Sequence, residues 1–188
     1  MNKLKFTSKL LITFLSLVLC TLLLLCIVPF KNNIDTTLQG IQWRLDDATS
    51  YEPVVITVKG IYKQHILNIV KDDTFNGTIE ISNYERTKNS EPQELIFSNE
   101  FATLLYDNKN DNYLNVPIYF GNINCTPSFS KIDIGVVERD SANTNILSWS
   151  AEDGLMITAP ATNLDEAIGV SKEVSKFIWL NQFQANGY

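Results

Sequence analysis

The first thirty residues divide into a basic tip and an uncharged apolar run. Residues 1–9 carry three lysines, and the twenty-one residues from Leu10 to Phe30 contain no charged side chain. A helix rises about 1.5 Å per residue, so a run of this length matches a hydrocarbon core of about 30 Å. We therefore expect a transmembrane helix over residues 10–30.

The flanks of the run favour a permanent anchor over a cleaved signal or a buried core helix. A cleavable signal has an apolar core of about 7–15 residues and ends in a small-x-small site. This run is longer and leaves through Val28-Pro29-Phe30-Lys31, without an Ala-x-Ala pattern. Because basic residues beside a span stay in the cytoplasm, we expect residues 1–9 to form a cytoplasmic basic tail. The rest of the chain then lies outside the cell. The protein is thus expected to be a single-pass protein of the cell membrane with an extracytoplasmic domain.

Residues 31–53 read as a polar neck for which two structures compete. Apolar residues at intervals of four, three and four form one helical stripe: Ile34, Leu38, Ile41 and Leu45. The same stretch also alternates strictly at Ile41, Trp43 and Leu45, which is typical of a strand. The pattern favours neither structure.

From residue 54 onward the pattern predicts β-structure. Val54–Val58 is rich in branched residues, Gly60 interrupts it and Ile61–Val70 resumes it, which indicates two strands or one long bulged strand. Asn76-Gly77, followed by the alternating Ile79 and Ile81, predicts a hairpin turn. Further strands, separated by turn residues, are expected at Leu95–Phe97, Phe101–Tyr106, Tyr113–Phe120, Ile132–Val137, Ile146–Trp149 and Leu155–Thr158.

Short strands at this spacing predict an antiparallel meander in a sandwich or barrel-like sheet. Ile132, Ile134 and Val136 place Asp133 on the opposite face, so we expect one face of the sheet to be wet. The expected turns between strands include residues 122–127.

The last segment changes to a helical period. Asn163 can cap a helix with Glu166 three residues later, and an apolar stripe begins at Leu164 and Ile168. We expect a helix over residues 163–183 that covers one face of the sheet, or alternatively binds a partner. The fold class is therefore mainly β (α+β), with one β-rich domain over residues 54–188.

Composition limits the partners and the means of stabilisation. After residue 30 there are twelve Lys and Arg against twenty-one Asp and Glu, a balance that disfavours nucleic acid and anionic lipid headgroups. Cys125 is alone in this part of the chain, because Cys20 and Cys26 lie in the apolar run. Without an intradomain disulfide, the domain must rely on its hydrophobic core, and this fits a Gram-positive cell surface. Cys125 itself is expected to be a buried thiol.

Candidate chemistry is sparse. His65 is the single histidine, no phosphate-binding or nucleophile-elbow motif occurs, and we expect no cofactor and no catalytic residue. The paired carboxylates are expected to be loop and turn residues: Asp46-Asp47, Asp72-Asp73 and Glu152-Asp153. One cluster, residues 107–112, is rich in hard oxygen donors, with Asp107, Asn110 and Asp111 as calcium candidates. An EF-hand would need Gly and Glu where the chain has Asn112 and Ile118, so a solvated hairpin loop competes with calcium.

Some segments carry a resemblance to known proteins. Val58–Tyr62 with Asp72–Ile81, and Gly154–Pro160 leading into Asp165-Glu166-Ala167, resemble small signal-anchored surface proteins of Firmicutes. The resemblance implies a bacterial cell-surface setting and no catalytic residue.

These features together predict a non-enzymatic, membrane-anchored domain that binds an unknown protein or glycan ligand or senses the envelope. One alternative is a surface hydrolase that acts on glycan with two carboxylates brought together by the fold. Another is an accessory subunit of a membrane complex, although the apolar run has no GxxxG pattern for tight helix pairing.

Overall fold

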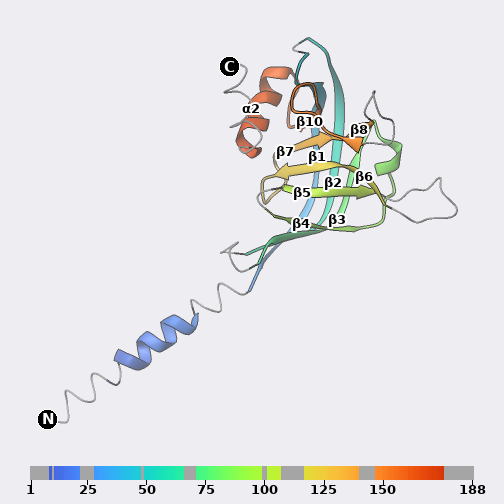
Figure 1. The fold of residues 1–188 in the computed structure, drawn as a ribbon. Helices are drawn as coiled ribbons and strands as arrows, with labels where there is room; N and C mark the ends of the chain where they lie inside the picture. The colour runs from blue at the N-terminus through green and yellow to red at the C-terminus, as the bar shows by residue number, and fades with distance from the viewer. Residues whose placement is uncertain are drawn as a thin grey trace.

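The strands of this protein form a nearly closed antiparallel barrel. The computed structural model describes residues 9, 11–21, 28–47, 49–65, 71–98, 101–106, 117–139 and 147–175. Eight of their strands make one sheet in the order β4-β3-β2-β1-β10-β7-β6-β5. The sheet curls until β4 (Gln93–Phe97) and β5 (Phe101–Tyr106) lie side by side, and helix α2 (Leu164–Val174) packs outside (Figure 1). The expected mainly β fold with a barrel-like sheet and a C-terminal helix is confirmed.

The remaining elements complete a meander that follows chain order, except that β10 closes beside β1. Their bounds are β1 (Phe30–Arg44), β2 (Tyr51–Gln64), β3 (Asp73–Ile81), β6 (Ile118–Cys125), β7 (Ile132–Val136) and β10 (Leu155–Ala159). A 3₁₀ turn, η1 (Glu85–Thr87), follows β3, and β8 (Glu138–Arg139) pairs with β9 (Leu147–Ser148) as a separate small hairpin. We call the end where β1 begins the base, and the end where β1 finishes the far end.

The barrel interior is filled by apolar side chains. Alternate residues along the eight barrel strands point inward, and most of them are buried, as at Ile56 and Val58 of β2 and Ile132 and Ile134 of β7. An eight-stranded barrel is just wide enough for such side chains to fill it. The interior is therefore a packed core.

Two facing glycines explain why the predicted turn at Asn76-Gly77 is wrong. Gly77 lies inside β3, directly opposite Gly60 of β2, and the Phe75 ring covers both. A Cβ atom on Gly77 would lie 2.6 Å from the Gly60 Cα and 2.7 Å from the Phe75 ring. The glycine therefore makes room for an aromatic ring in the core, and Gly60 lies within a single strand whose register with β3 is unbroken.

Phe129 seals the base of the barrel. It lies in the loop before β7, is fully buried, and has a φ of 54°, which is uncommon for a bulky residue. Its ring centroid lies 4.6 Å from that of Phe75 and 5.9 Å from that of Tyr62. Thr126 Oγ1 accepts from the backbone N–H groups of Ser130 and Lys131 and fixes the loop around it. The loop thus acts as an apolar plug.

Helix α2 covers the outer face of β1, β10 and β7. Asn163 Oδ1 accepts from the Glu166 N–H at 3.0 Å, so the predicted cap is confirmed. Ala167 of the helix packs on Trp43 and Met156 in a second, smaller apolar cluster outside the barrel. The helix ends at Val174, earlier than expected, and residues 176–183 of the expected helix lie outside the described residues.

This helix also corrects the expectation that the face carrying Asp133 is wet. Asp133 is 1 % exposed. Its carboxylate accepts from the hydroxyls of Thr158 at 2.6 Å, Ser171 at 2.6 Å and Ser175 at 2.7 Å. Burial raises the pKa of Asp133, against the lowering effect of these hydrogen bonds. The alternation of β7 does place Asp133 on the outer face of the sheet, but α2 covers this face and excludes water from it.

The segment expected to be a neck is the first barrel strand. β1 begins at Phe30 and pairs with β2 as far as Trp43, so the strand alternative is confirmed and the domain begins well before residue 54. Pairing on both sides, with β2 and with β10, favours the extended form over the helical stripe. Residues 122–125 likewise belong to β6 and are not a turn.

Residues 11–21 are helical and project from the base of the barrel (Figure 1). Residues 10 and 22–27 of the predicted transmembrane helix lie outside the described part of the chain. Among the described residues, no helix combines the length and the hydrophobicity needed to cross a bilayer.

Candidate functional site

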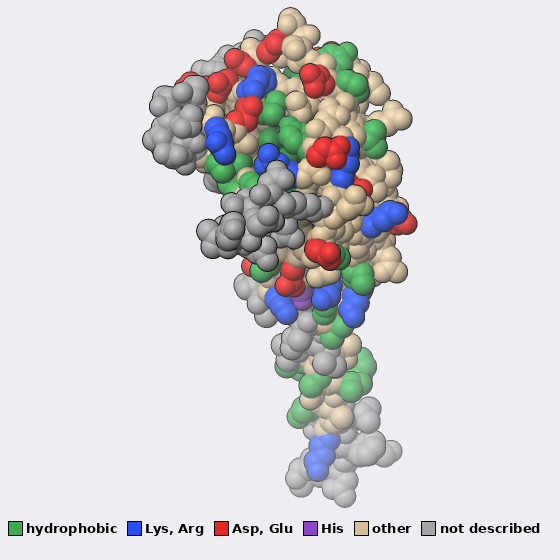
Figure 2. Space-filling view, turned by 90° about the vertical axis from the view of Figure 1, so that its right-hand side faces the viewer, with side chains coloured by type: hydrophobic (Ala, Val, Ile, Leu, Met, Phe, Trp, Pro, Cys, Tyr) green, Lys and Arg blue, Asp and Glu red, His purple; other side chains and the backbone are tan. Residues whose placement is uncertain are grey.

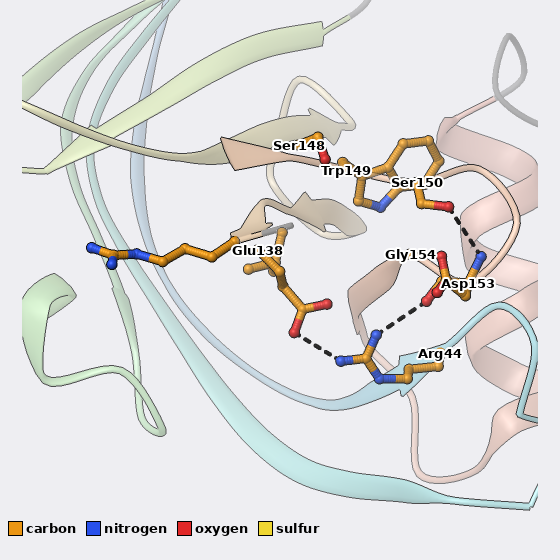
Figure 3. Close-up of a pocket in the computed structure, with 9 residues that line it drawn as sticks. Arg44, Glu138, Ser148, Trp149, Ser150, Asp153 and Gly154 are labelled. Carbon is orange, nitrogen blue, oxygen red and sulfur yellow. Dashed lines mark hydrogen bonds and ion pairs between the residues drawn. The ribbon is translucent and has the colours of Figure 1, made fainter. Parts of the chain in front are cut away.

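A polar pocket of about 410 Å³ opens at the far end of the barrel (Figure 3). It forms where the end of β1 meets the β8–β9 hairpin and the turn before β10. Its lining residues are Arg44, Val136, Glu138, Arg139, Ser148, Trp149, Ser150, Asp153 and Gly154. We call it the far-end pocket. The end of β1 and the β8–β9 hairpin, which frame it, lie at the end of the barrel opposite the N-terminal helical residues (Figure 1).

Arg44 is the central cation of the far-end pocket. Its Nη2 donates to Glu138 Oε1 at 2.7 Å, and its Nη1 donates to the backbone oxygen of Asp153 at 3.1 Å. The hydrogen bond to Glu138 is the main cause that raises the pKa of Arg44. Both side chains of this ion pair are a little more than two-fifths exposed, so a ligand can reach them. The guanidinium is held in place from two sides.

Trp149 forms an aromatic wall of the pocket beside two glycines. A Cβ atom on Gly135 would lie 3.1 Å from the indole Nε1, and one on Gly154 would lie 2.5 Å from it. At Gly154 there is therefore no room for a Cβ atom while the indole stays in place, and at Gly135 a Cβ atom would require the indole to shift by a few tenths of an ångström. Nε1 is buried and has no hydrogen-bond partner among the described residues.

The turn after Trp149 is ordered by a serine. Ser150 Oγ accepts from the backbone N–H groups of Glu152 at 3.1 Å and Asp153 at 3.4 Å. This hydrogen bonding turns the Asp153 carbonyl toward Arg44, as the dashed contacts in Figure 3 show. The expectation that Glu152-Asp153 belongs to a turn agrees with this geometry.

The pocket thus combines charged donors and acceptors, hydroxyls and an indole. Such a lining suits a ligand that offers hydrogen-bonding groups and an apolar face. Acid–base chemistry would depend on Glu138 and Asp153, since the histidine lies at the other end of the barrel.

His65 belongs to a buried polar cluster at the base. Its backbone N–H donates to Asp73 Oδ1 at 2.7 Å, and Tyr62 donates its hydroxyl to Asp73 Oδ2 at 2.9 Å. His65 Nδ1 lies 3.8 Å from Asp73 Oδ1. Asp73, read from the sequence as a turn residue, is instead a buried acceptor at the start of β3.

The other sequence candidates do not join the pocket. Asp107, Asn110 and Asp111, the calcium candidates, lie outside the described residues. In the described ranges, no three His, Cys, Asp or Glu side chains gather to hold a metal ion. Cys125 packs against the barrel core, and burial raises the pKa of its thiol.

Sequence reasoning missed Arg44 and Glu138 as site residues. Arg44 lay in the supposed neck, and Glu138 lay beyond the end of a predicted strand. They are 94 positions apart, and no local spacing links them. Comparison of the chain with protein-family models, with curated proteins and with solved structures finds no match.

Proposed function

We propose that this chain is a membrane-anchored, extracytoplasmic binding domain that presents the far-end pocket to a glycan and catalyses no reaction. Leu10 to Phe30 would hold it in the membrane of a bacterial cell, with the N-terminus inside. The packed barrel core supports this proposal, because a filled interior leaves a ligand only the outer surface. The elements that frame the pocket lie at the end opposite the N-terminal helical residues, so the pocket would face away from the membrane.

The single observation that carries the proposal is the Arg44–Glu138 pair beside the Trp149 indole. Sugar rings present hydroxyls at their edges and C–H groups on their faces. A fixed guanidinium and carboxylate can bind the hydroxyls, and an aromatic surface can pack on the C–H face. A volume of about 410 Å³ falls within the range of small-molecule sites.

Binding can be tested with the full chain in detergent and a chitin tetrasaccharide as the probe. We expect saturable binding by calorimetry, and about a tenfold loss of affinity in R44M, because a charge-assisted hydrogen bond contributes roughly this much. K59S, a lysine variant on the barrel wall away from the pocket, is the matched control. Binding that R44M leaves unchanged would refute the role of the pocket.

The hydrolase alternative is favoured by one observation, which is that Glu138 and Asp153 both line the pocket. It predicts that the full chain releases new reducing ends from the same tetrasaccharide, and that E138Q abolishes the release. Binding without release supports the binding domain.

Orientation has its own test. In intact cells, external protease should degrade residues 31–188 and spare the N-terminal tail. Protection of residues 31–188 would contradict an extracytoplasmic domain.

A further inference from the structure

At the base of the barrel, four residues that are paired across neighbouring strands form a row on the outer surface. Lys31 of β1 faces Lys63 of β2, Lys63 faces Thr74 of β3, and Thr74 faces Ile96 of β4. We call these four residues the base row. Their neighbours along the strands, such as Tyr62 and Phe97, are buried in the core, so the base row points outward.

The two lysines of the base row form an unfavourable pair. Residues directly opposite each other in an antiparallel sheet have Cβ atoms about 5 Å apart, and like charges at this distance destabilise the sheet. None of the ion pairs within the described ranges includes Lys31 or Lys63. Lys59, two residues from Ile61 on the same strand, instead faces Asp35. A cationic pair without a protein carboxylate is suited to bind an external anion.

Exposed apolar side chains lie beside this pair. Ile96 is 55 % exposed and Ile61 is 42 %, both on the face of the lysines, whereas Phe30, 52 % exposed, alternates to the other face. Figure 2 shows lysine and hydrophobic side chains together at the base, where the N-terminal segment leaves the barrel. Lysine beside exposed apolar residues is the composition of surfaces that lie in a membrane interface.

The start of β1 fixes how far this surface is from the bilayer. β1 begins at Phe30, which is also the last residue of the apolar run, and Lys31 is the next residue. No linker separates the run from the barrel. If the run spans the membrane, the base row must lie at the level of the lipid headgroups.

We propose that the base row docks on the anionic headgroups of the membrane that anchors the chain. Lys31 and Lys63 bind lipid phosphates, and Ile96 enters the interface. The inference rests on the proposed anchor. It also revises the expectation from net charge for the base row itself, which holds two lysines and no acidic residue, although Asp72 and Glu94 lie two positions from Thr74 and Ile96 along the chain.

The test uses the full chain in vesicles of phosphatidylcholine alone, or with 30 mol % phosphatidylglycerol, both carrying a headgroup spin label. A fluorophore is attached at Asn76→Cys, an exposed position beside Ile61, after Cys20, Cys26 and Cys125 are replaced by alanine. We expect quenching in the anionic vesicles and much less in the neutral ones. A fluorophore at Glu152→Cys, near the far end, should stay unquenched in both.

Substitutions then assign the effect to the lysines. Each lysine near an anionic surface changes the docked-to-undocked ratio about fivefold, so K31S/K63S should lower it about 25-fold. K59S should leave it unchanged, because Lys59 faces Asp35. Quenching that is equal in both lipids, absent in both, or unaffected by K31S/K63S would overturn the docking.

Failure of the anchor gives a different result. If sodium carbonate releases the chain from the vesicles in a flotation assay, the proposed membrane anchor is wrong, whatever the quenching shows. If the chain floats with the vesicles and the Asn76 fluorophore is not quenched, only the docking of the base row is wrong.

Discussion

The base and the far end of the barrel differ in how their polar and aromatic groups meet water. At the base, the Phe129 ring and the Asp73 carboxylate are buried. At the far end, Tyr84 caps the core half-buried and donates its hydroxyl to Gln42 at 2.7 Å, while Arg44 is partly exposed. Burial raises the pKa of Tyr84 to about 12. The comparison leads us to expect that the base contributes more to stability, while the far end exposes the polar groups that a ligand could contact.

The largest effect should come from removing the base plug. F129A would leave a cavity between the Phe75 and Tyr62 rings and lower the free energy of unfolding by about 4 kcal/mol. F129L retains most of the volume and should cost much less. Urea denaturation of both variants measures the difference. A loss below about 1 kcal/mol in F129A would mean that the base is not the stable end.

The next effect concerns the outer wall, where Asp133 connects β7 to α2. D133A would leave the hydroxyls of Thr158, Ser171 and Ser175 without their acceptor, at a cost of about 3 kcal/mol. D133N should cost less, because an amide can accept from Thr158 and donate to the two serines. Thermal denaturation at neutral pH compares the two variants.

The same residue predicts a pH dependence. Burial raises the pKa of Asp133 above its ordinary value of 3.8, so the folded chain binds this proton more tightly than the unfolded chain. Its stabilising contribution is full below 3.8 and is lost as the pH rises through the folded pKa. Relative to D133N, the wild-type chain should become less stable as the pH rises from 3.8. A difference between the two that does not change with pH would contradict the assignment.

Alanine substitutions at two glycines compare the tight packing of the base half of the barrel with the open surface of α2. G77A places a Cβ atom 2.1 Å from the backbone oxygen of Lys59 and should cost about 2 kcal/mol. G169A, on the surface of α2 with nothing within 4 Å, should stabilise by about 0.8 kcal/mol through helix propensity. Chemical denaturation of both variants measures whether each substitution raises or lowers the free energy of unfolding. A neutral G77A would show that the sheet shifts to accept a methyl group.

The smallest stability effect should come from the far end. R44M removes a partly exposed ion pair with Glu138 and should change the free energy of unfolding by less than about 1 kcal/mol. The effect should shrink further in 1 M salt, because salt screens exposed pairs. Denaturation at two salt concentrations measures it. A loss as large as that in F129A would remove the difference between the two ends.

The sequence correctly predicts those strands and helix caps that depend only on residues close together in the chain. The strand at Phe101–Tyr106, the strand around Leu155 and the Asn163 cap all follow from residues within a few positions. The predicted turn at Asn76-Gly77 is wrong because Gly77 is required by close packing against the Phe75 ring and the facing strand β2, not by a turn. That contact depends on the register of β2 with β3, which local turn propensity does not contain.

The candidate site was beyond the reach of sequence patterns for the same reason. Arg44 meets Asp153 only because β1 pairs with β10 and brings Arg44 opposite Leu155. Asp133 was placed correctly on an outer face, but its burial depends on where α2 docks. Long-range strand pairing therefore creates both the pocket and the polar cluster.

The long pairing of β1 with β2 also has a mechanical consequence. A force that pulls on the N-terminal segment and is resisted at the far end acts along β1 from Phe30 toward Arg44. Such a load shears the hydrogen bonds between β1 and its two neighbours together, whereas a load across the strands would open them one at a time. The first strand is thus oriented to carry a tension applied between Phe30 and the far end of the barrel.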